Sequence, residues 1–360
     1  MTERLPIGLN FISSTSLAAQ DANAWFQEAL SLCLQADALG FDHVKTVEHY
    51  LFDWGGATPN PMIFLAAVAA RTRQLRLGTA AVLPAFHHPV QLASELAMLD
   101  QLSGGRLDAG FARGFLPAEF ATFAVPMNES RRRFDEGVAQ IQKLWTEPNV
   151  TCAGEFHSFQ RANIKPPPHQ APHPPIFVAA VSTAESFRRA GAAGHHLMLV
   201  PGAPLPEMAA RLNVYRQARA EAGFSVEDAR IQVSVQAVSG TTVQEAMDAA
   251  RAPRARYLRL LAEAISNADD VDETDYPGYR EILSKIEDSP VESALKDGVI
   301  LLGNAEDMAG QMENIRAAMG PVSFSAHINF GGISLASAEQ TLHTLRDAGL
   351  RVLSSMGSGK

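Results

Sequence analysis

Short apolar runs alternate with longer amphipathic stretches along nearly the whole chain. The first apolar run, PIGLNFI at 6–12, predicts a buried strand, and residues 22–39 follow with helical spacing until Gly40 ends the helix. The same order of strand and helix then repeats. Further strands are predicted at 41–47, 75–83, 106–112, 176–180, 196–200, 231–238 and 322–329. Further helices are predicted at 61–72, 89–102, 129–145, 184–193, 206–222, 305–319 and 336–345.

Eight strands, each followed by a helix, are what a closed (β/α)8 barrel, or TIM barrel, requires. An open doubly wound sheet is the competing architecture. Eight units without a break in composition favour closure, and the first strand is not followed by the G-x-G-x-x-G turn of a dinucleotide-binding sheet. We therefore predict an α/β protein with a single barrel domain over residues 1–360.

Two segments interrupt the alternation. Residues 148–175 are rich in proline, including PPP at 166–168, and predict an irregular excursion with a short hairpin at 150–156. Residues 268–297, between the seventh and eighth strands, form an acidic insertion that includes Asp269 and Asp270. An insertion of this length on a barrel is either a lid over the functional site or a solvated surface flap.

Composition and charge narrow the classes of function. The formal net charge is −9, and the only tight basic run is RRR at 131–133, so a broad nucleic-acid surface is not expected. Two cysteines provide neither a disulfide framework nor a cysteine-rich zinc site, and the histidines are too scattered to predict a metal. No apolar run is long enough to span a membrane, and no signal peptide is visible. We expect a soluble, cytoplasmic protein.

The carboxyl ends of the strands are where a barrel places its chemistry. The second strand ends at Glu48 and His49. An imidazole at this position suits proton transfer near neutral pH, although a structural histidine is equally consistent with the pattern. Glu48 is expected to support His49. His87 and His88, in the loop after the third strand, are expected to be loop structure.

An anion clamp is predicted where the fourth and fifth strands end. Arg113 is followed by Gly114, which lets a guanidinium and the backbone approach an anion together. Ser182 and Ser186 lie at the start of a helix, where hydroxyls and free N–H groups can hold a phosphate. A salt bridge and a plain helix cap are the structural alternatives. Together with Arg131, these residues predict a seat for one phosphate dianion.

Six segments of the chain are distinctive as a set. They are GFDHVKTVEHY, PNPMIFLAAVAART, LRLGTAAVLPAFHHPVQLASELAMLDQLSGGRLDAGFARG, NESRRRFDEG, VAAVSTAES and GNAEDMAGQMENI. They extend over almost the whole chain, and the run at 75–114 is long and specific. On these segments the chain resembles the bacterial luciferase-like family of flavin-dependent monooxygenases. The resemblance implies a (β/α)8 barrel, usually a homodimer through helices near strands two and three, with FMN at the carboxyl end.

The resemblance also implies roles for particular residues. The clamp residues named above match the family's phosphate contacts. Ala80 and Ala81 match a non-proline cis peptide beneath the isoalloxazine ring, and both are therefore expected to contact the cofactor. His49 matches the family's catalytic histidine, and Glu48 matches its neighbour.

Three positions depart from the luciferases themselves. Ala112 stands where they carry a reactive cysteine, Tyr50 where they have a second histidine, and Val181 where they have an acidic residue. The missing thiol leaves space beside the flavin ring and argues against a light-emitting role.

The favoured hypothesis is a two-component monooxygenase. Reduced FMN from a separate flavin reductase would react with O2 to oxygenate a small organic substrate, with His49 as general base or hydrogen-bond donor. One alternative is a deazaflavin-dependent hydride-transfer enzyme, against which the acidic insertion argues because the deazaflavin tail is itself acidic. A non-catalytic flavin-binding protein is the other. The substrate is not identified, and Phe11, Phe115 and Phe120 could line a pocket or fill the core.

Overall fold

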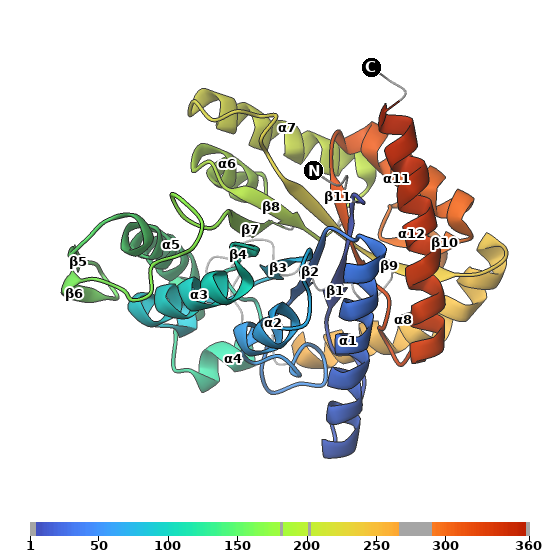
Figure 1. The fold of residues 1–360 in the computed structure, drawn as a ribbon, viewed down its shortest axis with the longest axis horizontal. Helices are drawn as coiled ribbons and strands as arrows, with labels where there is room; N and C mark the ends of the chain where they lie inside the picture. The colour runs from blue at the N-terminus through green and yellow to red at the C-terminus, as the bar shows by residue number, and fades with distance from the viewer. Residues whose placement is uncertain (1–4, 181–182, 201–202, 266–289, 358–360) are drawn as a thin grey trace.

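The computed structural model describes residues 5–180, 183–200, 203–265 and 290–357. Its central feature is a ring of parallel strands surrounded by helices (Figure 1). In ring order the strands are β1 (Ile7–Phe11), β2 (His43–Thr46), β3 (Arg76–Thr79), β4 (Leu107–Phe111), β7 (Ile176–Ala180), β8 (His196–Leu199), β9 (Ile231–Ser239) and β11 (Ser323–His327). The pairings of β8 with β9 and of β11 with β1 close the ring. The predicted (β/α)8 barrel is therefore confirmed, and an open sheet is excluded.

The helices lie outside this ring (Figure 1). They are α1 (Ala19–Leu39), α2 (Pro61–Ala69), α3 (Pro89–Ser103), α4 (Pro117–Thr122), α5 (Ser130–Thr146), α6 (Ala184–Ala192), α7 (Leu205–Glu221), α8 (Val243–Ile265), α10 (Val291–Lys296), α11 (Ala305–Met319) and α12 (Leu335–Gly357), with 3-10 turns at Pro84–Phe86 and Met127–Glu129. Local signals set several ends: Asn60 caps α2 before a proline, and Gly40 ends α1 in the left-handed conformation. The sequence did not predict α4, α8 or α10.

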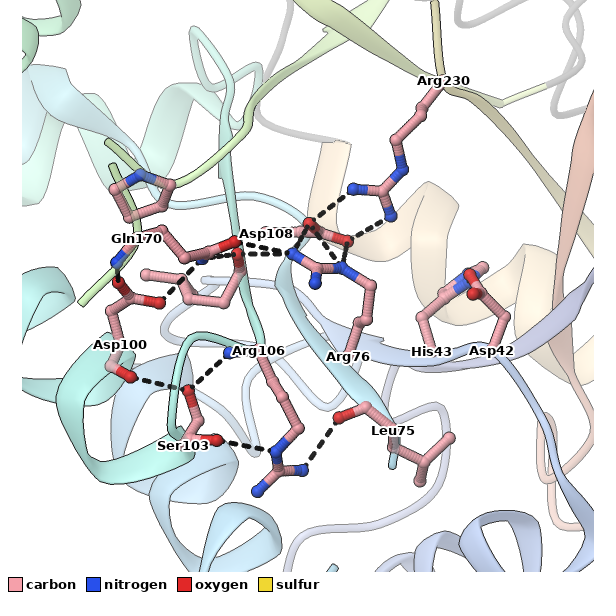
Figure 2. Close-up of polar contacts among 12 residues, drawn as sticks. Asp42, His43, Leu75, Arg76, Asp100, Ser103, Arg106, Asp108, Gln170 and Arg230 are labelled. Carbon is pink, nitrogen blue, oxygen red and sulfur yellow. Dashed lines mark hydrogen bonds and ion pairs between the residues drawn. The ribbon is translucent and has the colours of Figure 1, made fainter. Parts of the chain in front are cut away.

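The proline-rich excursion contains the predicted hairpin, which is formed by β5 (Val150–Ala153) and β6 (Ser158–Ala162). Its second strand lies further along the chain than expected. The return segment is fixed to α3 by the buried carboxylate of Asp100, which accepts the backbone N–H groups of His169 and Gln170, both at 2.8 Å (Figure 2). This carboxylate therefore satisfies backbone donors that no regular element pairs.

The predicted insertion at 268–297 is only partly visible, because residues 268–289 lie outside the described part of the chain. The remaining residues include α10, whose Val291 and Ala294 are buried in one cluster with Met247 of α8 and Ile300. Ile300 begins β10 (Ile300–Gly303), a further parallel strand beside the carboxyl half of β9 that the sequence did not predict. This end of the insertion is thus packed into the barrel wall and is not a solvated flap.

Polar side chains on β2, β9 and β11 meet on the inward face of the barrel. The Nζ of buried Lys45 donates to Ser234 Oγ at 3.1 Å, from β2 to β9. His43 Nε2 lies 2.6 Å from Ser325 Oγ on β11. The strand β1 lies between β2 and β11, so the His43 side chain must cross over β1 to reach Ser325. It crosses at Gly8, which has no side chain, and a Cβ at Gly8 would stand 2.4 Å from the His43 ring. The outward faces of the same strands are apolar and pack against the helices.

A charge cluster occupies the amino end of the barrel (Figure 2). Asp108 on β4 is 2% exposed and lies between two arginines. Arg76 donates to it from Nη2 at 2.6 Å, and Arg230 donates from Nη1 at 2.8 Å and Nη2 at 2.7 Å. Burial disfavours the charged form, but the two guanidinium groups hold the pKa of Asp108 far below its ordinary value. Every charge-bearing group of this cluster therefore has a partner, as buried ions require.

Candidate active site

The imidazole of His49 is held by a buried carboxylate at the carboxyl end of the barrel. His49 comes just after β2 and is 5% exposed, and its Nδ1 lies 3.2 Å from Oε1 of Glu119 on α4. Glu119 is fully buried and also accepts the backbone N–H of Tyr50 at 2.6 Å. Because an ionised carboxylate only accepts, Nδ1 carries the hydrogen, which leaves Nε2 as the basic nitrogen of the neutral ring.

Aromatic side chains surround this imidazole. The ring centroids of Trp54 and Phe115 lie 4.9 and 5.6 Å from that of His49. Of the three phenylalanines considered for a pocket, Phe115 is therefore the one beside His49. Phe11 is fully buried in the main core, and Phe120 is buried against Phe86.

The carboxylate of Glu48, next to His49 in the chain, is used to hold two loops together. Its carboxylate is 1% exposed and accepts three hydrogen bonds, from the Leu83 N–H at 2.9 Å and from His87 Nε2 and the Tyr50 hydroxyl, both at 2.7 Å. These bonds fix the end of β2 to the loop after β3. Burial opposes protonation of His87, but the hydrogen bond and the charge of Glu48 raise its pKa above the ordinary value. His87 thus holds its own loop to the end of β2, and His88 caps α3 and packs beside the rings of His157 and Phe159.

The peptide bond between Ala80 and Ala81 is cis, as the resemblance predicted. The two methyl groups belong to a small apolar cluster with Ala112, Phe177 and Met198. Three of these five side chains are alanine, so only small methyl groups project from the cluster at the carboxyl ends of β3 and β4.

The structure brings Arg113, Arg131 and Ser186 to one cavity. Arg113 Nη2 donates to Ser130 Oγ at 2.9 Å, and Arg131 Nη2 donates to Ser186 Oγ at 3.2 Å. Thr183 caps α6, and its hydroxyl lies 2.8 Å from that of Ser186. The predicted contact Ser182 lies outside the described residues.

This cavity measures about 340 Å3 and lies between α5 and α6. Besides Arg113 and Arg131, its charged lining comprises Arg189 and Asp135, which pair at 3.1 Å. Burial raises the pKa of Asp135 despite the three guanidinium groups. At its far end burial lowers the pKa of His195 to about 4, so that imidazole is neutral. The cavity lining thus brings three guanidinium groups and one carboxylate together, and guanidinium groups are well suited to bind a phosphate dianion.

The clamp and His49 lie at the same end of the barrel. Arg113 follows β4 and His49 follows β2, and both strands run parallel in the ring. Phe115, only two residues after Arg113, reaches the His49 ring. The segment that carries Arg113 therefore also contacts His49.

Sequence reasoning missed three members of the site: Glu119, Ser130 and Thr183. A signal for Glu119 exists, because it is the one charged residue in FLPAEFATFAV at 115–125. A lone carboxylate in an apolar run needs a buried partner if the run folds inward. Ser130 and Thr183 had no comparable signal, since hydroxyl residues at helix starts are ordinary caps.

The described residues contain no group of three or more His, Cys, Asp or Glu side chains arranged to hold a metal. In the same part of the chain, no helix has both the length and the apolar character of a membrane span.

Comparison with known proteins identifies a solved structure that is similar over nearly the whole chain and a curated relative that matches part of it. The solved structure of the monooxygenase RslO1 from Streptomyces bottropensis is 38% identical, with a TM-score of 0.84 over 96% of this chain and 98% of that one. The oxygenase component of the flavin-dependent trigonelline monooxygenase of Acinetobacter baylyi is 38% identical over 157 residues, 43% of each protein. An F420-dependent secondary alcohol dehydrogenase shares the fold alone, at 17% identity and a TM-score of 0.72 over 95% of this chain and 99% of that one.

The first curated relatives are matched over only part of their length, about half of each (55% and 43%). The family model described as luciferase-like monooxygenase, in contrast, matches residues 9–321. This range contains the barrel strands β2 to β9, the clamp and His49. The chain belongs to the luciferase-like monooxygenase family.

Proposed function

We propose that this protein is the oxygenase component of a two-component monooxygenase, which binds reduced FMN and uses O2 to oxygenate a small organic molecule. The observation that carries the proposal is the joint placement of an arginine-lined cavity and a carboxylate-held imidazole, since Arg113 and His49 both follow strands at the carboxyl end of the barrel. Membership of the family supplies the class of chemistry, and the 38% identity to a monooxygenase over nearly the full chain favours oxygenation over deazaflavin-dependent hydride transfer.

The residues present fit the phosphate of FMN. Arg113 and Arg131 supply planar donors, Ser186 supplies a hydroxyl, and the cavity between α5 and α6 has a volume of about 340 Å3, which is enough for a phosphate. The alanines at 80, 81 and 112 would lie against the flat ring. Bound reduced flavin supplies the electrons that activate O2.

The chain's own residues would then position the substrate and transfer a proton to or from it. His49 Nε2 would accept a proton from the substrate or donate one to it, because Glu119 stabilises the imidazolium that forms. Glu48 would act as a positioning residue through the loop after β3. The rings of Trp54 and Phe115 would exclude water from the reacting atoms.

The phosphate assignment is tested by titrating the purified protein with FMN and with riboflavin, which lacks the phosphate, and following flavin fluorescence. Arg113→Ala should weaken FMN binding at least about tenfold and leave riboflavin binding unchanged. The matched control is Arg188→Ala, because Arg188 is exposed on α6 and pairs with Glu185 instead of lining the cavity. Equal FMN dissociation constants for the wild type and Arg113→Ala would contradict the assignment.

The oxygenation assignment is tested by supplying reduced FMN from a flavin reductase and measuring O2 consumption and product. His49→Ala should keep FMN affinity and slow oxygenation about a hundredfold, within the range for loss of a general base. An unchanged oxygenation rate would refute the role of His49. Anaerobic hydride transfer with a reduced deazaflavin, and none with FMN, would support the alternative instead.

Two further parts of the proposal concern assembly and location. The adjacent helices α2 and α3 expose Ile63 at 72%, Met98 at 53% and Leu102 at 61%, an apolar face that fits the homodimer implied by the family. Met98→Glu should convert a dimer into a monomer in light-scattering chromatography, and an unchanged mass would argue against this interface. A cytoplasmic location, shared with the reductase, completes the proposal.

A further inference from the structure

Four polar side chains at the carboxyl end of the barrel have no use in the site described above. They are Asn10 on β1, Gln236 on β9, His327 on β11 and Asn329 just beyond β11. All four are between 3% and 6% exposed. Each carries a polar atom without a hydrogen-bond partner among the described residues: Asn10 Oδ1, Gln236 Nε2, His327 Nε2, and both Oδ1 and Nδ2 of Asn329. We call these residues the polar strip.

The strands place the polar strip on one side of the ring. His327 pairs in register with Gln236, and Asn10 continues the β1–β11 register opposite His327. The three side chains therefore form a row across β1, β11 and β9. These strands lie across the ring from β4 and β7, whose ends carry the phosphate clamp. Buried polar atoms in native proteins almost always have partners, so four such residues in one place need an explanation.

The chemical character of the orphan atoms follows from their neighbours. Arg254 on α8 donates to Gln236 Oε1, and since a guanidinium only donates, the Gln236 amide must turn its NH2 group the other way. The His327 ring is hydrogen-bonded to the backbone of Ile12, and burial lowers the pKa of His327 to about 3. The ring is therefore neutral and carries one N–H hydrogen. Because Nε2 is the nitrogen without a partner, Nδ1 makes the bond to the backbone and carries that hydrogen, so Nε2 is an acceptor. The strip thus offers donors and acceptors together, and no free charge.

Aromatic rings connect the polar strip to His49. The centroid of Trp54 lies 4.9 Å from that of His49 and 6.2 Å from that of Tyr257, and Tyr257 lies 5.6 Å from His327. Tyr257 belongs to α8, which rests on the loop after β11: a Cβ at Gly331 would stand 1.8 Å from the carbonyl oxygen of Pro253. A continuous series of ring contacts therefore forms an aromatic wall between the strip and the candidate catalytic imidazole.

We propose that the polar strip binds the organic substrate, and that this substrate is an uncharged, planar molecule with a hydrogen-bond donor beside a carbonyl, such as a lactam or a hydroxyaryl ketone. The inference rests on the proposed oxygenase function. The N–H or O–H of the substrate donates to His327 Nε2 or Asn10 Oδ1, and its carbonyl accepts from Gln236 Nε2 or the Asn329 amide. The aromatic rings contact its faces, and His49 lies at the other end of the same wall.

The test uses two planar probes with the protein loaded with FMN. 2-Quinolone presents an N–H beside a carbonyl, and N-methyl-2-quinolone is the matched probe without the donor. The variant is Asn329→Leu, which removes two orphan atoms without breaking any hydrogen bond to a described residue. The control is Asn213→Leu, the same exchange at an exposed position of α7. Calorimetry gives probe affinity, flavin fluorescence gives FMN affinity, and thermal unfolding gives Tm.

In the wild type we expect 2-quinolone to bind at least about tenfold more tightly than its N-methyl derivative, because the derivative leaves a buried acceptor unpaired. Asn329→Leu should weaken 2-quinolone about tenfold, keep FMN affinity and not lower Tm, whereas Asn213→Leu should change none of these. No binding of 2-quinolone, or no preference for it, would overturn the proposal. Equal weakening of FMN would assign the strip to the flavin instead. Absence of FMN binding in the wild type would refute the proposed function separately.

Discussion

The charge cluster at the amino end of the barrel makes a sharp prediction about stability. Asp108→Asn keeps the shape of the side chain but removes the carboxylate that is hydrogen-bonded to both Arg76 and Arg230, which leaves the more distant charge of Asp42 beside Arg230 (Figure 2). Asp108 is 2% exposed and both arginines are at least two-thirds buried, so water replaces the lost charge poorly. Breaking a buried pair in this way costs about 3–5 kcal/mol, and the part-exposure of Arg230 favours the lower end of that range.

The dependence on pH gives a second signature. The pKa of Asp108 is depressed in the folded state, so its contribution is fully present above the unfolded pKa of about 3.9 and is lost as the pH falls toward the folded value. The difference in free energy of unfolding between the wild type and Asp108→Asn should therefore be constant from about pH 5 to pH 8. Below about pH 4 it should shrink.

The assay is urea unfolding followed by circular dichroism at pH 7 and at pH 3.5. Asp347→Asn is the matched control, because its ion pair with Arg346 is exposed on α12 and should contribute less than about 1 kcal/mol. A loss below about 1 kcal/mol for Asp108→Asn would refute the reasoning, since it would mean that the two guanidinium groups need no buried counter-charge.

Three further outcomes test the site and its support. Glu119→Gln should retain FMN binding but lower the oxygenation rate about tenfold, because a neutral amide does not stabilise an imidazolium as a carboxylate does. An unchanged oxygenation rate would count against this. His87→Gln should lower the free energy of unfolding by about 1 kcal/mol at pH 6 and by less at pH 9. The reason is that a group whose pKa is raised by folding stabilises the protein below its unfolded pKa and loses this contribution as the pH rises. Equal losses of unfolding free energy in urea at both pH values would contradict the pairing with Glu48. Gly331→Val should destabilise the protein by about 2–4 kcal/mol in the same assay, because α8 leaves no room for a side chain and the backbone has φ +57°; an unchanged unfolding midpoint would mean that α8 does not rest there.

The barrel could be predicted because its signals are local. Each of the eight ring strands is a short segment that contains buried apolar residues and has a helix after it, and glycine or proline separates many of the units. Parallel strands place their carboxyl ends together, so naming the strand ends was enough to bring His49 and Arg113 to the same end of the ring. The cis peptide at Ala80 and Ala81 came from the family resemblance and not from any local pattern.

The elements that escaped prediction are those whose local signals conflict with their structure. The helix α8 contains Pro253 in its interior, where proline normally ends a helix. Its many charged residues also make the apolar positions of its buried face difficult to recognise in the sequence. The strand β10 is only four residues long and pairs with the end of β9 that extends beyond β8. The packing of α8 on Gly331 and of β10 on β9 depends on contacts between segments far apart in the chain.

The sequence by itself determined the order of the eight ring strands and of most helices around them, favoured closure of the ring, and indicated which end carries the candidate chemistry, since these follow from periodicity and from the direction of parallel strands. The tertiary structure alone decided which side chains meet. Glu119 holds His49, Glu48 ties two loops together, and Asn10 and His327 face inward from neighbouring strands. The physical reason is that hydrogen bonds and ion pairs require positions within about 3 Å, and residues separated by tens to hundreds of positions reach that precision only after the barrel has closed.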